Sequence, residues 1–308
     1  MVNRTKPNAF IVGAPKCGTT GMHTFLESHP DICVALYKEV LYFGSDLFSD
    51  RTSREYKTEE WYLNLFSHCQ DRKIILESSV WYFYSQQAPS EIHNFSPDAR
   101  IIIMLRNPVE RLYSHYYQLL YNGHENIKSF EAALAAEPER KAGKKSSSSD
   151  ALTRRLYYRE NAHYTPYVRA YLQEFGREKV HIIIHDDMVA DVARVYRETL
   201  EFLDVDPEFA PEFTSVNANK YIRSSFVRDF FRKPPAWLTT PARQIIPAKT
   251  RAKINRQMIP AVRRLNTRYD KRPPLDAALR KQLQQECLAD IEQLSELLER
   301  DLTHWCQS

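Results

Sequence analysis

Short apolar runs recur along the first two thirds of the chain, with helix-type patterns between them. The runs "AFIVG", "DICVAL", "KIILE", "ARIIIMLR" and "KVHIIIHDD" begin at Ala9, Asp31, Lys73, Ala99 and Lys179. They are continuous rather than alternating, which is typical of parallel strands covered on both faces. The pattern therefore predicts an α/β fold, with a parallel sheet flanked by helices on both faces.

Segments with helical periodicity separate or follow these predicted strands. One stretch runs from residue 19 to 28 and stops at Pro30. Another, "NPVERLYSHYYQLLYNG", begins with a proline suited to a first helical turn and ends in the stop signal Asn122–Gly123. The stretches "DVARVYRETLEFLDV" and "LDAALRKQLQQECLADIEQLSELLERDL" have the same period. We expect one domain over residues 1–308, with a basic, mainly helical C-terminal portion from 219 to 308.

One stretch breaks this alternation. Residues 135–150, "AAEPERKAGKKSSSSD", are basic, serine-rich and without periodicity. They predict a mobile surface loop, and a lid over a substrate is the alternative.

Composition and cysteine use favour a globular intracellular protein. Hydrophobic residues make up 43% and charged residues 27% of the chain, as in ordinary soluble proteins. No apolar run approaches the roughly 20 residues that cross a bilayer, and the N-terminus lacks the apolar stretch of a signal peptide. The five cysteines are scattered and form no zinc-type spacing. We expect a cytoplasmic protein with reduced, mainly structural thiols; peripheral membrane contact and a reactive Cys17 are the alternatives.

Charge is concentrated in one segment. Residues 220–272 carry 15 Lys and Arg against two Asp, a formal charge of +13 in a chain whose total is +4. A solvated basic face explains such a segment, and so does a surface that receives an anionic polymer or an anionic membrane. No nucleic-acid partner is expected.

The stretch "FIVGAPKCGTTGMHTFLESHP" carries the first chemical signal. Its glycines have the spacing of a nucleotide-binding Walker A loop, but the lysine that follows the second glycine in that loop is missing. Lys16 lies inside the loop instead. A strand, a glycine-bounded turn and a helix N-terminus together direct main-chain N–H groups at an anion. Thr19 and Thr20 are placed to add hydroxyl donors and to cap the helix.

This pattern resembles the phosphate loop of the sulfotransferases that use 3′-phosphoadenosine-5′-phosphosulfate (PAPS), closest to the carbohydrate type, whose fold is related to the P-loop kinases. The resemblance implies that the loop holds the 5′-phosphate, and that Lys16 stabilises the bridging oxygen as the S–O bond breaks. The implied donor-binding residues of this loop are Lys16, Cys17, Gly18, Thr19 and Thr20.

A second motif, "IIIMLRNPVERLYSHY", resembles the family's 3′-phosphate site. The resemblance implies that Arg106, at the strand end, and Ser114, on the next helix, bind this phosphate. Arginine offers a planar, bidentate fork for phosphate. An ordinary Arg–carboxylate pair is the alternative for Arg106.

A third stretch, "HPDICVALYKEVLYFG", resembles the segment in which glycan-type members carry the catalytic base. The matching residue is Glu39, which would remove the proton of an acceptor hydroxyl. Lys38 would position the sulfate or lower the pKa of Glu39. Glu77, at the end of "KIILESS", is the other candidate base, and a structural carboxylate is its alternative.

Two weaker similarities extend the resemblance over nearly the whole chain. Residues 160–205 are similar to the family's closing strand and helix. The stretch "VNANKYIRSS" resembles a basic loop that closes over the donor, which implies contacts from Lys220, Tyr221 and Arg223.

Taken together, these motifs predict in-line transfer of a sulfuryl group from PAPS to an acceptor hydroxyl or amine, on a glycan or glycolipid, without a metal. A P-loop kinase or NTPase using ATP–Mg²⁺ is one alternative, with "VHIIIHDD" as its acidic strand end. A non-catalytic binder of polyanions or membrane surfaces is the other.

Overall fold

The computed structural model places two compact units. The first comprises Met1–His115, Phe130–Val216 and Leu275–Ser308, and the second Tyr116–Ser129 and Asn217–Pro274. The residues described are 5–47, 57–143, 153–213, 220–222, 265–269 and 272–307.

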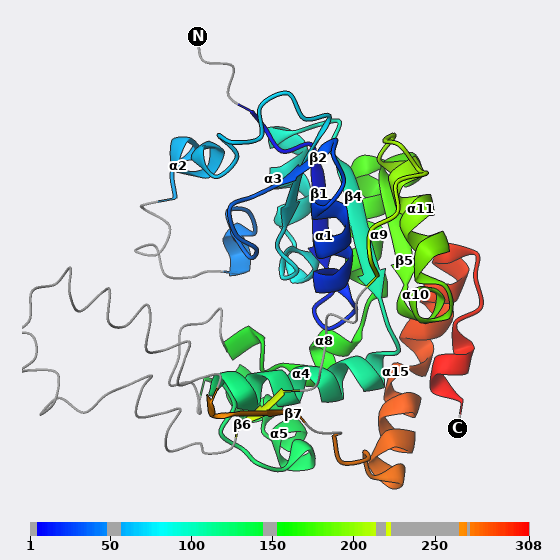
Figure 1. The fold of residues 1–308 in the computed structure, drawn as a ribbon. Coiled ribbons are helices and arrows are strands. Elements are labelled where there is room, and N and C mark those ends of the chain that lie inside the picture. The colour runs from blue at the N-terminus through cyan, green and yellow to red at the C-terminus, as the bar shows by residue number, and fades with distance from the viewer. Residues whose placement is uncertain are drawn as a thin grey trace, which may run out of the picture. The chain divides into compact units, whose positions relative to one another are not determined.

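A five-stranded parallel sheet forms the centre of the first unit (Figure 1). Its strand order is β2-β3-β1-β4-β5, and all four neighbouring pairs are parallel. Each predicted apolar run contains one of these strands, so the predicted α/β fold is confirmed. The strands are β1 (Ala9–Gly13), β2 (Ile32–Val34), β3 (Ile74–Ser78), β4 (Arg100–Leu105) and β5 (Val180–Ile184).

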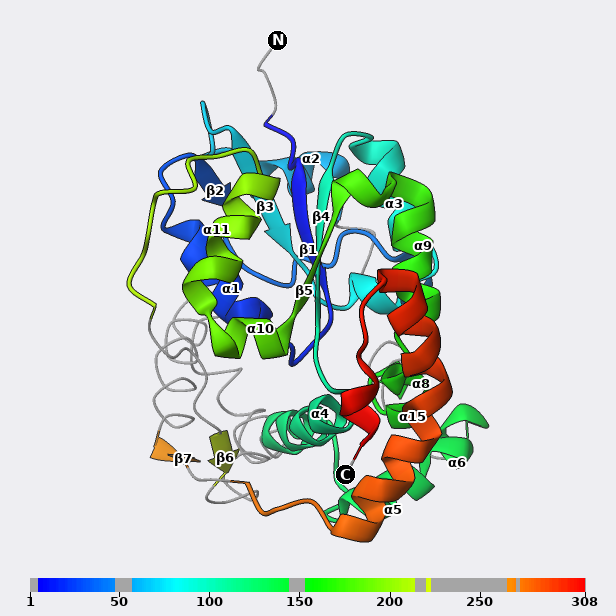
Figure 2. The same cartoon turned by 90° about the vertical axis from the view of Figure 1, so that its right-hand side faces the viewer.

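Helices cover both faces of this sheet. Helices α1 and α11 lie on one face, and α3 and α9 lie on the other (Figure 2). The β1-to-β2 and β3-to-β4 connections run in opposite directions along the sheet, so right-handed crossovers put their helices on opposite faces. The bounds are α1 (Thr19–Glu27), α3 (Ala88–Phe95), α9 (Thr165–Phe175), α10 (His185–Ala190) and α11 (Val192–Phe202).

Two predicted helices are confirmed, and side chains cap both of them. Helix α4 (Pro108–Asn122) begins with its proline, and the Asn107 carboxamide oxygen accepts hydrogen bonds from the N–H groups of Val109 and Glu110. Helix α15 (Ala277–Leu298) is capped by Asp276. The remaining helical elements are η1 (Ser45–Leu47), α2 (Glu59–Asn64), η3 (Tyr82–Tyr84), α5 (Phe130–Ala135), α6 (Glu137–Lys141), α8 (Tyr158–Ala162), η4 (Arg177–Lys179) and η5 (Thr303–Cys306).

The second unit contains a short antiparallel pair that the helical pattern did not predict. Strand β6 (Lys220–Ile222) pairs with β7 (Thr267–Tyr269). The hydroxyls of Tyr121 and Thr267 are hydrogen-bonded at 2.8 Å. In the described part of residues 219–308, most of the helical structure is therefore α15.

The prediction of a mobile loop from residue 135 is wrong at its start. Glu137 begins helix α6 and is buried, and its carboxylate accepts hydrogen bonds from the N–H groups of Arg159 and Glu160. Lys141, one turn on, pairs with the same carboxylate at 3.1 Å. These non-local contacts order a segment whose composition alone is typical of a loop. Residues 144–150 lie outside the described part.

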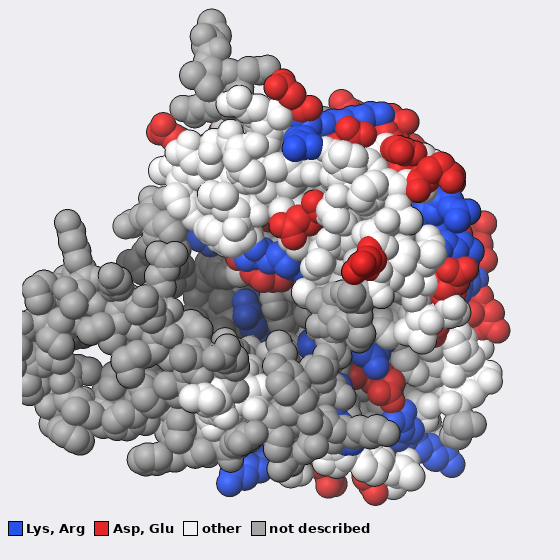
Figure 3. All heavy atoms as spheres, in the orientation of Figure 1, with Lys and Arg blue, Asp and Glu red and all other residues white. Residues whose placement is uncertain are grey.

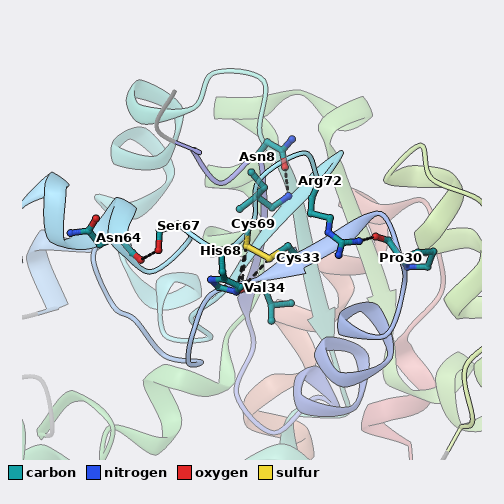
Figure 4. The surroundings of a disulfide bond; sticks show 10 residues. Asn8, Pro30, Cys33, Val34, Asn64, Ser67, His68, Cys69 and Arg72 are labelled. Carbon is teal, nitrogen blue, oxygen red and sulfur yellow. Dashed lines mark hydrogen bonds between the residues drawn. A yellow bond between two sulfur atoms is a disulfide. The ribbon is translucent and has the colours of Figure 1, made fainter. Parts of the chain in front are cut away.

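Cys33 and Cys69 form a disulfide bond (Figure 4). The prediction of reduced thiols is therefore wrong for this pair. The fold brings their Cα atoms to 5.5 Å across 36 positions of sequence, a distance suited to a disulfide. Disulfides are rare in a reducing cytosol, so the bond weighs against the cytoplasmic location expected from the sequence.

The same pair belongs to a metal-type cluster. With His68, Cys33 and Cys69 form a His/Cys group, found among the described residues, that is close enough together for a metal ion. Sulfurs bonded to each other are not thiolate ligands, however.

None of the described helices combines the length and the apolar character that crossing a bilayer requires.

Gly13, the last residue of β1, gives a test of this packing. A Cβ at this position would lie 2.3 Å from Cβ of Phe83 and 2.8 Å from the carbonyl oxygen of Val80. We expect Gly13→Ala to lower the free energy of unfolding by about 2–4 kcal/mol. Urea unfolding followed by circular dichroism measures this change.

Gly21→Ala is the matched control. Its Cβ would meet only side-chain atoms at 3.5 Å or more, in the first turn of α1. Alanine is the better helix former, so this variant should equal or exceed the wild type by up to about 1 kcal/mol. Equal stabilities for the two variants would contradict the close approach at Gly13.

Candidate active site at the carboxyl edge of the sheet

The loop between β1 and α1 has the geometry of an anion site. Gly18 is the N-cap of α1 with φ 92°, and no side chain caps the helix. Its left-handed conformation suits glycine, whereas Lys16 adopts φ 71° at a cost in backbone strain. Uncapped N–H groups and the helix dipole favour a bound anion at this terminus.

The two threonines do not cap the helix, contrary to the prediction. They are instead its first two residues: Thr19 is buried and Thr20 is exposed. Gly18 takes the cap position because the loop turns there with a positive φ angle.

Cys17 is not a reactive thiol. Its side chain is completely buried and its Sγ donates to the Pro15 carbonyl at 3.8 Å. Burial raises the pKa of this thiol to about 11, so it stays protonated at neutral pH. Only the main chain of Cys17 remains as a candidate contact to a ligand.

Parallel pairing places the second motif beside this loop. Strand β4 neighbours β1, and the N–H of Ala14 donates to the Met104 carbonyl at 2.8 Å. Arg106 follows the end of β4 directly. After β1 the chain continues to β2 and β3 on one side of β1, whereas β4 and β5 lie on its other side. The carboxyl ends of β1 and β4 therefore form the switch point at which α/β sheets bind ligands.

Arg106 is not engaged in a close carboxylate pair. Its Nη2 lies 3.9 Å from Oε2 of Glu110, whereas Arg280 approaches Oε1 of the same carboxylate to 2.7 Å. Charge-assisted hydrogen bonds are about 2.7–2.9 Å long, so the close pair belongs to Arg280. Ser114 is buried on α4, two turns beyond Arg106.

Glu39 is hydrogen-bonded to the end of β3, the strand on the other side of β1. Its N–H donates to the Ser78 carbonyl at 2.9 Å, and its Oε2 accepts a hydrogen bond from the Val80 N–H at 3.2 Å. Both partners lie at the end of β3, which pairs with β1. Desolvation raises the pKa of the Glu39 carboxyl, while Lys38, Arg155 and the Val80 N–H oppose this shift.

Lys38 connects Glu39 to the phosphate loop. Its Nζ donates to the Thr19 carbonyl, in the first turn of α1, at 3.3 Å. Burial lowers the pKa of Lys38, and the Glu39 carboxylate opposes that effect. The fold therefore brings the predicted base and its neighbouring cation to the start of α1.

Glu77 is enclosed rather than presented to the site. It is 0% exposed, and its carboxylate accepts hydrogen bonds from the hydroxyls of Tyr62, Tyr82 and Ser79. Burial raises its pKa to about 7, although the three hydroxyl donors lower it. This arrangement is typical of a structural carboxylate in a core.

Arg155 is a site residue that the sequence reasoning missed. Its guanidinium lies 4.9 Å from the ring centroid of Trp81, a cation–π distance. It also acts electrostatically on Glu39, from 116 positions away in the chain. It lines a small cavity with Trp81 and Tyr84. No local motif marks such a residue, because only the fold brings it to the base.

The basic loop "VNANKYIRSS", predicted to close over the donor, is described only in part. Lys220 and Tyr221 form β6 with Ile222 in the second unit, and Arg223 lies outside the described residues. Most of the segment 220–272 also lies outside the described residues. Its predicted contacts with the donor, an anionic polymer or a membrane stay predictions.

The acidic strand end proposed for a kinase has other partners. Asp187 pairs with Arg300 at 2.7 Å through Nη2, and Asp186 accepts a hydrogen bond from Trp305 Nε1 at 2.6 Å. Both aspartates belong to α10. Acidic and basic side chains are mixed over the neighbouring helix α11, at the right-hand edge of Figure 3, as on a solvated face. This arrangement does not favour a magnesium site there.

Comparisons with known proteins point to one family. The family described as "Sulfotransferase domain" matches residues 6–229. Heparan sulfate glucosamine 3-O-sulfotransferase 6 of Mus musculus is 40% identical over 38% of this chain and 32% of its own length. Carbohydrate sulfotransferase 15 of Mus musculus is 27% identical over 66% of this chain and 45% of its own.

A solved structure matches over nearly the whole chain. The sulfotransferase from Alicyclobacillus acidocaldarius has a TM-score of 0.71 and 27% identity, over 98% of this chain and 99% of that one. By contrast, the chain spans less than half the length of the two curated relatives above. The match to more than half of the chain and the shared fold lead to one assignment: the chain belongs to the sulfotransferase family.

Proposed function

We propose that this chain transfers the sulfuryl group of PAPS to a hydroxyl of a carbohydrate, with Glu39 as the base. One observation carries the proposal. An uncapped helix N-terminus, a strand-end arginine and a desolvated glutamate lie at the ends of three adjacent strands. Two phosphate sites and a base are what this reaction requires.

The residues fit a donor with two phosphate groups. The loop offers main-chain N–H groups at the start of α1, and Arg106 offers its guanidinium at the end of β4. The loop would hold the 5′-phosphate, while Arg106 and Ser114 would hold the 3′-phosphate. PAPS, when bound, supplies the sulfuryl group and a phosphate leaving group.

The charges of the chain suit the transfer itself. Lys16 belongs to the phosphate loop, and its charge helps to lower the pKa of the His115 imidazole. From there it would stabilise the negative charge that develops on the departing phosphate oxygen. Fixed cations would thus supply the stabilisation that Mg²⁺ gives in kinases.

Glu39 suits the role of base for two reasons. Desolvation raises the pKa of its carboxyl above the ordinary value, which strengthens the carboxylate as a proton acceptor. Its side chain is also partly exposed, whereas Glu77 is enclosed by three hydroxyls. The carboxylate would accept the proton of the acceptor hydroxyl as this oxygen attacks sulfur.

A glycan is the acceptor class that we favour, on a polysaccharide or on a lipid. The two mammalian relatives are a heparan sulfate sulfotransferase and a carbohydrate sulfotransferase by name. We favour the hydroxyl over the amine because the relative of 40% identity is named a 3-O-sulfotransferase. With either acceptor, Glu39 would accept the proton that the nucleophile loses.

Donor binding gives the first test. Calorimetric titration should show that adenosine 3′,5′-bisphosphate binds without magnesium and more tightly than ATP–Mg²⁺. We expect Arg106→Ala to weaken this binding roughly 10- to 100-fold, because a charge-assisted fork to phosphate is lost. Lys16→Ala should reduce turnover by roughly 100-fold or more.

Glu110→Gln is the control for Arg106→Ala, because it removes the neighbouring carboxylate and keeps the guanidinium. It should bind the bisphosphate at least as tightly as the wild type. A preference for ATP–Mg²⁺ would favour the kinase alternative, and folded protein that binds neither nucleotide would contradict the donor assignment.

The two candidate bases are separated by a pair of variants. Glu39→Gln should lower turnover by roughly 10²- to 10⁴-fold and leave bisphosphate binding unchanged. Transfer of labelled sulfate from PAPS to a panel of glycans measures turnover. Glu77→Gln should retain most of that turnover. The reverse result would assign the base to Glu77.

Glu77→Gln should instead change the pH dependence of stability. The folded-state pKa of about 7 exceeds the ordinary 4.5, so the Glu77 carboxyl stabilises the fold below pH 4.5. That stability is lost as the pH rises through 7, by ~3 kcal/mol in all. We expect urea unfolding of the wild type to show this decline relative to Glu77→Gln.

Arg155 should set the pH at which the base becomes active. Its positive charge lowers the pKa of Glu39, so Arg155→Met should raise the midpoint of the acidic limb of kcat/KM by roughly one pH unit. Arg154→Met is the matched control, because Arg154 pairs with Asp46 at 3.6 Å. An unchanged midpoint in Arg155→Met would contradict the assignment of this limb to Glu39.

A further inference from the structure

Arg111 is a buried cation without a counter-charge in the described protein. It lies in the second turn of α4 and is 0% exposed. Its Nη2 donates to the Asn161 carbonyl, while its Nε and Nη1 have no hydrogen-bond partner. No ion pair to Arg111 exists among the described carboxylates.

Such an arrangement is unfavourable for stability. A buried charge without an ionic partner costs several kcal/mol, and each unmade hydrogen bond of a buried group adds to that. The rings of Tyr84 and Tyr164 lie 5.7 Å and 5.8 Å from the guanidinium carbon and offset part of this penalty. Buried donors left unpaired in a protein call for a functional explanation.

The groups around Arg111 are neutral. Cys17 is a protonated thiol, since its pKa is raised to about 11. His115, next along α4, is an uncharged imidazole, because burial and the charge of Arg111 lower its pKa to about 3. No carboxylate contacts Arg111 in the described part of the chain, because the nearby Asp290 accepts hydrogen bonds from the Tyr164 and Thr165 N–H groups instead.

Both proposed phosphate sites lie next to Arg111. The guanidinium acts electrostatically on Cys17, inside the phosphate loop. It also borders Tyr164, whose hydroxyl donates to the Arg106 carbonyl at 2.8 Å. Arg111 is thus linked to the loop proposed for the 5′-phosphate through its effect on Cys17, and to the residue proposed for the 3′-phosphate through Tyr164. In a low-dielectric interior its charge is weakly screened.

We propose that Arg111 is a positioning residue for the sulfuryl donor, and that the donor's phosphates supply the counter-charge that the protein lacks. This inference rests on the proposed function. The guanidinium does not touch the ligand; it attracts the anion through the loop and orients the loop and Arg106 through Tyr164. The unpaired charge of Arg111 lowers the stability of the free protein, and binding of the anionic donor offsets this loss.

Two substitutions separate charge from shape. Arg111→Met removes the charge and keeps much of the length, and Arg111→Lys keeps the charge. In Arg111→Met the Asn161 carbonyl keeps a donor, since the Tyr84 hydroxyl binds the same oxygen at 2.8 Å. Each full-length protein is titrated calorimetrically with adenosine 3′,5′-bisphosphate and with adenosine 5′-monophosphate, and its thermal unfolding is recorded without ligand.

We expect Arg111→Met to bind the bisphosphate roughly 10- to 100-fold more weakly, with a smaller loss for the less charged monophosphate. Arg111→Lys should stay within roughly threefold of the wild type for both ligands. Without ligand, Arg111→Met should unfold at the same temperature as the wild type or higher, because a buried unpaired charge is gone.

Three results would overturn the inference. They are an unchanged bisphosphate affinity in Arg111→Met, an equal loss for both nucleotides, and unfolding of that variant at a lower temperature than the wild type. The last would make Arg111 a structural residue. Wild-type protein that binds no bisphosphate would overturn the proposed function as well, so the two failures are distinguishable.

Discussion

The position of β1 between β3 and β4 is the constraint on which the site depends. Parallel pairing aligns the carboxyl ends of all three strands. The loop after β1 therefore has Arg106 on one side and, on the other, the end of β3 that holds Glu39 through the Val80 N–H. The close approach of Gly13 to Phe83 fixes the strand end from which the loop starts. The proposed donor and base sites are thus positioned by one strand register.

Uncompensated positive charge is the second property of this edge. Glu110 pairs closely with Arg280 rather than with Arg106. Arg111 is buried without any ionic partner in the described residues. A protein built for stability alone would pair or replace such charges. Their position near the loop fits the proposed donor site: an anion that bound there would meet donors that are already desolvated, so little reorganisation would oppose its binding.

The sequence predicts those parts of the structure that depend on local pattern. Continuous apolar runs predict all five strands of the parallel sheet, and Pro108 predicts the start of α4. The residues that escape prediction act through distant partners. Arg155 reaches Glu39 only after folding, the Cys33–Cys69 bond closes across 36 positions, and Glu137 orders α6 through N–H groups beyond residue 153. The predicted capping by threonine fails because Gly18 supplies the positive φ angle that the loop requires.

The choice between the two carboxylates shows why a raised pKa alone does not identify a base. Desolvation raises the pKa of both Glu39 and Glu77. In Glu77 the carboxylate oxygens face three hydroxyl donors in the core, so a proton has no route to an acceptor substrate. Glu39 has one main-chain donor and a partly exposed side chain beside Lys38, which binds the first turn of α1. Proton transfer needs access as well as basicity, and in the described site Glu39 combines the two.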